Sequence, residues 1–93
     1  MIEKNATVVN KLGLHARAAA KLVSEASQYQ AQMEIEKEGK RANAKSIMSI
    51  MMLAATHGTP VRLFTSGPDE QEAMQALVAL FESGFGEGAE PCP

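Results

Sequence analysis

Two periods of apolar residues run along the chain, and each predicts its own kind of element. A period of two predicts β-strands over 2–9, 32–37 and 61–66, and the alternation of apolar and polar residues is clean over 32–37. In the second of these strands Met33 and Ile35 face inward between exposed glutamates, a pattern more typical of antiparallel than of buried parallel sheets. In the third, Val61, Leu63 and Thr65 share one face. Glu38 and Gly39 predict a tight turn into a short strand over 40–43.

Helical spacing predicts two long helices. The first is expected over 16–27, where good helix formers follow one another without Gly or Pro. Its inner face carries Ala19, Leu22, Val23 and Ala26. The last helix begins near Asp69, which has Glu72 at capping-box spacing, and ends near Ser83. The apolar stripe of this helix is Met74, Leu77, Val78 and Phe81.

A third, short helix is expected over 46–54, with Ser46 as its N-cap. Its apolar residues are more than one face can bury: Ile47, Met48, Ile50, Met51, Met52 and Leu53. Part of this helix is therefore expected on the surface, where methionine side chains form adaptable contacts with different partners. The alternative, in which all of these residues belong to the core, stays open.

The elements follow one another as strand, helix, strand, strand, helix, strand and helix. This order predicts an α+β layer in which helices cover one face of a small sheet. A chain of 93 residues suffices for one domain with a single modest core. We expect that domain to comprise residues 1–85, followed by a flexible tail over 86–93, which is rich in Gly, Pro and Glu.

Composition narrows the classes of function. The chain is 45% apolar and 22% charged, as is usual for soluble globular proteins. No apolar run approaches the roughly 20 residues that span a bilayer, and the first residues lack the features of a signal peptide. The single cysteine, Cys92, excludes an internal disulfide framework. The few aromatic residues argue against nucleic-acid binding by base stacking. We therefore expect a cytoplasmic protein without membrane insertion.

Charge is distributed unevenly along the chain. All nine Lys and Arg lie within residues 1–62 beside five acidic residues, a balance of +4. Residues 63–93 carry six acidic residues and no Lys or Arg, a balance of −6. A basic face formed by His15, Arg17, Lys21 and Lys45 would suit acidic proteins or phosphate groups. For any single lysine, an ordinary solvated position remains an equal alternative.

The candidate chemistry centres on His15, which follows a turn glycine, Gly13, and falls at or beside the N-cap of the first long helix. The N–H groups at a helix start have no helical acceptor, so together with the helix dipole they favour an anion there. A neutral imidazole is a nucleophile, and Arg17 adds a cation whose planar fork suits phosphate oxygens. This arrangement indicates reversible phosphorylation of His15, although a histidine near a helix start is often an exposed residue without a task.

Residues 13–17, with the Ala19-Ala20 and Leu22-Val23 pairs that follow, resemble the phosphohistidine signature of the HPr family. These proteins are the phosphocarriers of the bacterial phosphoenolpyruvate-dependent phosphotransferase system. Residues 45–51 resemble the second signature of the family, and the similarity extends over about 8–81. The resemblance implies an open-faced β-sandwich, in which a four-stranded antiparallel sheet is covered on one face by three helices.

The resemblance also implies a function. His15 would accept a phosphoryl group at Nδ1 from phospho-enzyme I and pass it to EIIA-type proteins, in sugar transport or in a nitrogen-related branch. Arg17 and the backbone N–H groups of Ala16 and Arg17 would stabilise the phosphate. Such a protein is a stoichiometric carrier rather than an enzyme, and it requires no metal or other cofactor. The sequence does not distinguish the two branches. Many carriers have proline at position 18, and three features lean slightly toward the nitrogen-related branch: Leu12, the run Ala18-Ala19-Ala20 and the methionine-rich short helix.

The same resemblance implies two roles for the short helix. Ile47, Met48 and Met51 would form the surface on which partner proteins dock. In some bacteria the family's serine at the place of Ser46 is phosphorylated by HPr kinase/phosphorylase, which makes Ser46 a candidate regulatory site. The alternative is an N-cap serine that is never modified.

Two other functional classes stay open. A regulatory interaction module would act through the Ser46 helix without phosphotransfer. A nucleotide-binding protein would use residues 39–46, which match the phosphate-binding pattern G-x-x-x-x-G-K-S except that Ala44 occupies the second glycine position. A metal site is not expected, because His15, His57 and Cys92 have no compact ligand spacing.

Overall fold

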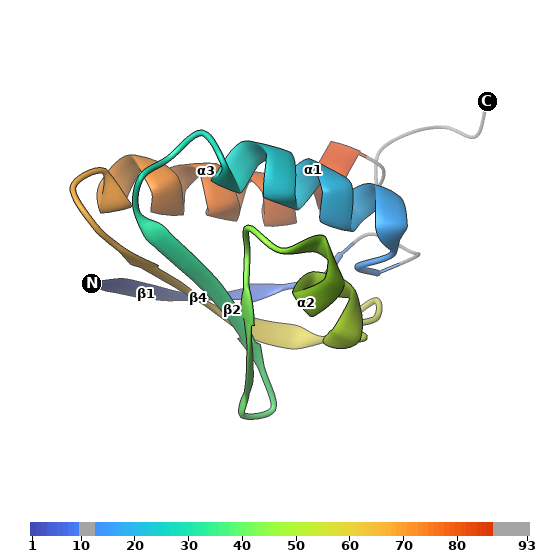
Figure 1. Ribbon diagram of the computed structural model, residues 1–93. Helices are drawn as coiled ribbons and strands as arrows, with labels where there is room; N and C mark the ends of the chain where they lie inside the picture. The colour runs from blue at the N-terminus through green and yellow to red at the C-terminus, as the bar shows by residue number, and fades with distance from the viewer. Residues whose placement is uncertain (10–12, 87–93) are drawn as a thin grey trace.

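Four strands form one antiparallel sheet in the order β1-β4-β2-β3 (Figure 1). The computed structural model describes residues 1–9 and 13–86. Its strands are β1 (Ile2–Thr7), β2 (Gln32–Lys37), β3 (Lys40–Asn43) and β4 (Pro60–Ser66). Its helices are α1 (Ala16–Ala26), α2 (Ile47–Met52) and α3 (Glu70–Glu82), followed by a single 3₁₀ turn, η1 (Gly84–Gly86). The predicted fold class and order of elements are confirmed.

The helices lie on one side of the sheet, with α1 and α3 side by side over it and α2 against α1 and β3 (Figure 1). The inward residues of the predicted strands and helices meet in one core. Its largest fully buried side chains are Phe81, Phe85, Leu22, Met33, Ile35, Ile50, Leu63, Met74, Leu77 and Val8. Val23 and Val78, expected among them, are only half-buried, and Val78 packs against the edge of this core.

The hairpin between β2 and β3 turns at the two residues expected from the sequence. Lys37 pairs with Lys40, so Glu38 and Gly39 alone form the connection. Both have positive φ, 52° and 85°, as the type of two-residue turn that matches strand twist requires. The turn thereby fixes which side chains of β2 point toward the helices.

The helix-free face of the sheet is charged, yet it buries an aromatic ring. Phe64 points to this face and is only 4% exposed, because the Arg41 guanidinium lies 4.1 Å from the centre of its ring. Arg41 also pairs with Glu34 at 3.0 Å. Periodicity along β4 does not predict this burial, because the cover comes from a charged side chain on another strand.

The capping box expected at the start of α3 is wrong. Asp69 is the N-cap residue, but its side chain makes no capping hydrogen bond to its own helix, and Glu72 is exposed. The Asp69 carboxylate instead accepts the backbone N–H groups of Gln30 at 2.9 Å and Ala31 at 2.8 Å. These hydrogen bonds, that of Gln30 foremost, hold the pKa of Asp69 below its ordinary value. The acidic start of α3 therefore fastens the segment that joins α1 to β2.

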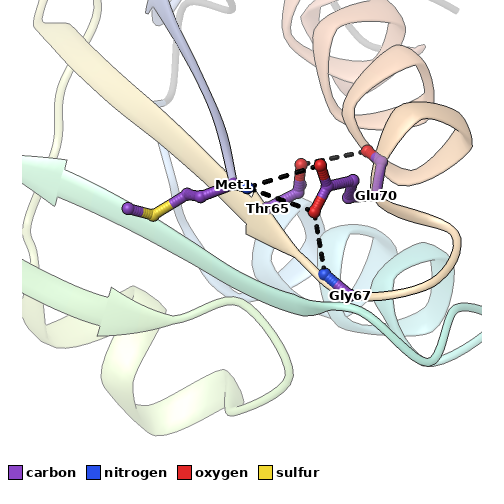
Figure 2. Close-up of polar contacts among 4 residues, drawn as sticks. All are labelled: Met1, Thr65, Gly67 and Glu70. Carbon is purple, nitrogen blue, oxygen red and sulfur yellow. Dashed lines mark hydrogen bonds and ion pairs between the residues drawn. The ribbon is translucent and has the colours of Figure 1, made fainter.

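Glu70 connects the start of α3 to two strands (Figure 2). Its carboxylate accepts the Gly67 N–H at 3.0 Å and lies 3.3 Å from the Met1 ammonium. The Gly67 N–H first and the Met1 ammonium second keep the pKa of Glu70 below its ordinary value. The buried hydroxyl of Thr65 donates to the Glu70 carbonyl at 3.0 Å, which satisfies a polar group inside the core.

The chain leaves α3 through a short turn that still belongs to the core. Phe85 is 1% exposed and packs edge-on against Phe81, with ring centres 4.9 Å apart. Its carbonyl accepts a hydrogen bond from the Lys21 ammonium at 2.9 Å.

The tail predicted over 86–93 lies almost wholly outside the described residues. None of the helices in the described part combines the length and the apolar character that crossing a membrane requires.

Candidate functional site

His15 is the N-cap residue of α1, as the sequence predicts. Its backbone is extended, with φ −82° and ψ −177°, while its carbonyl accepts the Ala19 N–H at 2.8 Å in the first helical hydrogen bond. Its side chain turns back onto the helix start, where Nδ1 accepts the Arg17 N–H at 3.2 Å. The ring is half-exposed, so a reacting group can reach it from solvent.

This hydrogen bond assigns different roles to the two ring nitrogens. Because Nδ1 accepts from Arg17, it carries a lone pair, and the proton of the neutral ring lies on Nε2. The lone pair is directed at a backbone N–H in the first turn of α1, where the helix dipole favours negative charge. A group that bonds to Nδ1 therefore arrives beside a hydrogen-bond donor of this turn.

Gly13 and Leu14 fasten His15 to the segment that follows α2. The Leu14 N–H donates to the Ala55 carbonyl at 2.9 Å, and the Leu14 side chain is buried. Gly13 has φ +68°, and a Cβ atom there would lie 2.5 Å from the same oxygen. Only glycine meets both demands, which explains the turn glycine before the histidine.

The segment that contacts Gly13 follows α2 and is itself hydrogen-bonded to strand β2. Past the C-terminus of α2, Ala54 has a positive φ of 54°. The Lys37 ammonium donates to the carbonyls of Leu53 at 2.9 Å and Ala54 at 3.2 Å, which are acceptors at the helix C-terminus. This role of Lys37 was not predicted, although alternation along β2 puts Lys37 on the same face as Met33 and Ile35. An inward lysine needs an acceptor, and that signal could have found the contact.

The expected basic face divides into two parts. Arg17 and Lys21 are one turn apart on α1 and both are exposed. Lys45 lies near the other end of this helix, because its ammonium donates to the carbonyl of Tyr29 at 2.7 Å. The 11 residues of α1 extend over about 16 Å at 1.5 Å per residue. The prediction that groups Lys45 with His15 is therefore wrong.

The second helix exposes one apolar side, as expected. Ile47 and Met51 are each 41% exposed, Met48 is 70% and Met52 is 76% exposed. Ile50 and Leu53, on the opposite side, are buried. We call Ile47, Met48, Met51 and Met52 the α2 patch. Ser46 is the N-cap, and its Oγ accepts the Ser49 N–H at 3.3 Å.

The stretch that matches a nucleotide-binding pattern does not form a phosphate loop. Gly39 lies in the hairpin turn, and the next four residues are strand β3. The Lys45 ammonium is directed at the Tyr29 carbonyl. Residues 39–46 thus span an extended edge strand, whereas a phosphate-binding loop curls its N–H groups around one point. Among residues 1–9 and 13–86, no three metal-ligating side chains gather.

Comparison with known families gives the decisive observation. A family model described as "PTS HPr component phosphorylation site" matches residues 2–83. The chain belongs to the HPr family. It is 53% identical over 88 residues to the phosphocarrier protein HPr of Cupriavidus necator, which covers 95% of this chain and 99% of that protein. It is also 51% identical over 82 residues to the HPr-like protein Crh of Halalkalibacterium halodurans, covering 88% of this chain and 98% of the relative.

The architecture agrees with that membership. A crystal structure of HPr from Thermoanaerobacter tengcongensis matches with a TM-score of 0.90 at 50% identity, over 94% of this chain and 98% of that one. The family resemblance read from residues 13–17 and 45–51 is thereby confirmed. Members of the HPr family are phosphocarriers of the phosphotransferase system.

Proposed function

We propose that His15 accepts a phosphoryl group at Nδ1 from phospho-enzyme I and delivers it to an EIIA-type protein. The observation that carries this proposal is the hydrogen bond of 3.2 Å from the Arg17 N–H to Nδ1 at the N-cap of α1. It supplies an accessible nucleophile with its lone pair already directed at a donor. The protein acts as a stoichiometric carrier and not as an enzyme.

The transfer needs little more than alignment and charge compensation. The Nδ1 lone pair forms the new N–P bond while the N–P bond of the donor breaks, and those bond electrons return to the donor nitrogen. The proton stays on Nε2 throughout. The Arg17 N–H, released from Nδ1, comes to lie beside the phosphoryl oxygens, together with the Ala16 N–H of the same helix end. The Arg17 guanidinium adds a mobile positive charge from the surface.

The α2 patch supports the proposed contacts with enzyme I and the receiving protein. Helix α2 packs against α1, so the patch flanks the helix that begins at His15. Ile47, Met48 and Met51 would contact enzyme I and the receiving protein through their exposed apolar side chains. Arg17 and Lys21 would contribute attraction for acidic surfaces on these partners. Which receiving protein is used decides between sugar transport and the nitrogen-related branch.

Phosphorylation of Ser46 by an HPr kinase/phosphorylase would regulate this docking. Ser46 directly precedes Ile47 of the α2 patch, and the residue is half-buried. A phosphate there adds about −2 charge next to a surface that receives acidic partners, so it would weaken the complex by repulsion. Nothing in this role requires His15 to change.

The test is incubation with enzyme I and phosphoenolpyruvate carrying a labelled phosphate. A carrier takes up one acid-labile, alkali-stable phosphate, and the His15→Ala variant takes up none. Absence of label in the folded wild-type protein would contradict the proposal. Measured transfer rates from the phosphorylated protein to individual EIIA-type proteins then identify the branch.

A second candidate is an interaction module that acts through the α2 patch without phosphotransfer. Two observations support this candidate: the similarity to an HPr-like protein Crh and the exposed apolar side of α2. The same labelling experiment discriminates, because such a module binds its partner equally well as wild type and as His15→Ala and receives no phosphate.

A further inference from the structure

The methionines of the described residues fall into two environments. Met48 and Met52 are 70% and 76% exposed on α2, Met51 beside them is 41% exposed and Met1 is 73% exposed, whereas Met33 and Met74 are 1% and 2% exposed in the core. Met48 and Met52 are four residues apart in one short helix, so their thioethers lie on the same side. A thioether in solvent is open to oxidants, and Met48 and Met52 are the most exposed residues of the α2 patch, the surface proposed to contact partners.

We propose that Met48 and Met52 form a reversible oxidation site through which peroxide-class oxidants lower the carrier's ability to dock. This inference rests on the proposed function, because it assumes that the α2 patch contacts enzyme I. It goes beyond that function because it assigns a covalent modification to two residues and predicts that the resulting sulfoxides weaken docking.

The chemistry balances with hydrogen peroxide as the oxidant. The sulfur lone pair attacks one peroxide oxygen, an S–O bond forms and the O–O bond breaks. The sulfur loses two electrons, the peroxide gains them, and the leaving hydroxide takes up the remaining proton to give water. The product is methionine sulfoxide, which methionine sulfoxide reductases return to the thioether, one enzyme for each sulfoxide epimer.

The location explains why this oxidation would change docking but not the fold. Both side chains already lie in solvent, so a polar S=O group there costs the free protein little. In a complex the same group would be taken out of water at an apolar contact and left without a donor, which weakens binding. Oxidation of Met33 or Met74 would instead put a polar group into the core and unfold the protein.

The experiment uses the full chain with Cys92→Ser, so that no thiol consumes the oxidant. After graded exposure to hydrogen peroxide, peptide mapping by mass spectrometry gives the rate of oxidation at each methionine. We expect Met48 and Met52 to react at least about tenfold faster than Met33 and Met74. Phosphotransfer from enzyme I then gives KM and kcat for the oxidised protein, and we expect KM to rise by about tenfold with little change in kcat.

Two variants make the result specific. Met48→Leu/Met52→Leu keeps an apolar surface of similar size but has no thioether at either position, so peroxide should leave its KM at the value that this variant has before treatment. Met48→Gln/Met52→Gln carries a polar acceptor without oxidation, so its KM should match that of the oxidised protein. Treatment with both classes of methionine sulfoxide reductase should restore the wild-type KM.

The outcomes separate this inference from the proposed function. Unchanged KM after complete oxidation of Met48 and Met52, or equal oxidation of the buried methionines, would overturn the oxidation site. A rise in KM when the leucine variant is treated with peroxide, relative to the same variant untreated, would also overturn it, because the damage would then lie elsewhere. Failure of the untreated protein to receive phosphate would count against the carrier function alone, while binding of enzyme I before and after oxidation would still decide this inference.

Discussion

Gly13 lies so close to Ala55 that a Cβ atom on it would come within 2.5 Å of the Ala55 carbonyl oxygen. The same oxygen accepts the Leu14 N–H at 2.9 Å. The residue two positions before His15 thus lies in contact with the backbone that follows α2. The position of His15 therefore depends on a contact between two loops as well as on its own helix.

Replacing Gly13 with alanine should separate these two loops. The new Cβ meets backbone that cannot give way, and φ of +68° is strained for any side chain, so we expect a loss of about 2–4 kcal/mol in the free energy of unfolding. Urea denaturation measures this, and phosphotransfer should slow in parallel. Gly39→Ala is the matched control, because φ is +85° there but no atom lies within 4 Å of the new Cβ. The control should lose only about 1 kcal/mol, and equal losses in both variants would show that the contact with Ala55 is unimportant.

The opposite substitution should stabilise the protein at Ala54. This residue follows the C-cap of α2 with a positive φ of 54°, the place where helices commonly carry glycine. Ala54→Gly removes the strain of a side chain in this conformation, and we expect a gain of about 0.5–1 kcal/mol by urea denaturation. Ala79→Gly, at an exposed position inside α3, should lose about 1 kcal/mol. A loss at both positions would contradict the strain at Ala54.

The elements that alternation and helical spacing predict are those whose burial is decided locally. Met33 and Ile35 in β2 and the stripe of α3 needed no knowledge of their partners, because the core lies on one side of each element. His15 as an N-cap was equally predictable, since it depends on where the helix formers begin.

What could not be predicted depends on residues far apart in the chain. Asp69 and Glu72 have capping-box spacing, but Asp69 finds better donors in Gln30 and Ala31, 39 and 38 residues away. Phe64 is buried by Arg41 from another strand. Sequence spacing carries no information about either contact until the sheet order β1-β4-β2-β3 is known.

The contact of Asp69 makes stability depend on pH. Its pKa is lowered in the folded protein, chiefly by the Gln30 N–H, so its contribution is present above the unfolded pKa of about 3.9 and is lost as pH falls through the folded pKa. Asp69→Asn should therefore be less stable than wild type at neutral pH, and the difference should shrink below about pH 4. Urea denaturation across this range measures it. Glu72→Gln, an exposed carboxylate on the same helix, is the control. A constant difference between wild type and Asp69→Asn at every pH would refute the role of the charge.

A negative charge at Ser46 should weaken recognition of enzyme I without loss of the fold. Aspartate is as good an N-cap as serine, so Ser46→Asp should keep α2 and its patch. Repulsion from an acidic partner should raise KM for phosphotransfer by about tenfold. Ser46→Asn is the matched control, because it caps the helix without charge and should transfer as wild type does. Equal KM values for the aspartate and asparagine variants would remove Ser46 from the docking surface.

The Arg17 side chain should matter for transfer and not for folding. It is exposed on the first turn of α1, so Arg17→Ala should change the free energy of unfolding by no more than about 0.5 kcal/mol. Its guanidinium should stabilise the phosphoryl group in the transition state of transfer, so loss of the guanidinium should lower kcat by about tenfold or more. Rapid-quench measurement of labelled phosphate on His15 gives this rate.

Arg17→Lys restores the charge but not the planar fork, so its rate should fall between those of wild type and the alanine variant. The Arg17 N–H that meets Nδ1 belongs to the backbone and remains in all three proteins. Identical rates in all three would therefore leave the backbone N–H groups as the whole of the phosphate stabilisation from this chain.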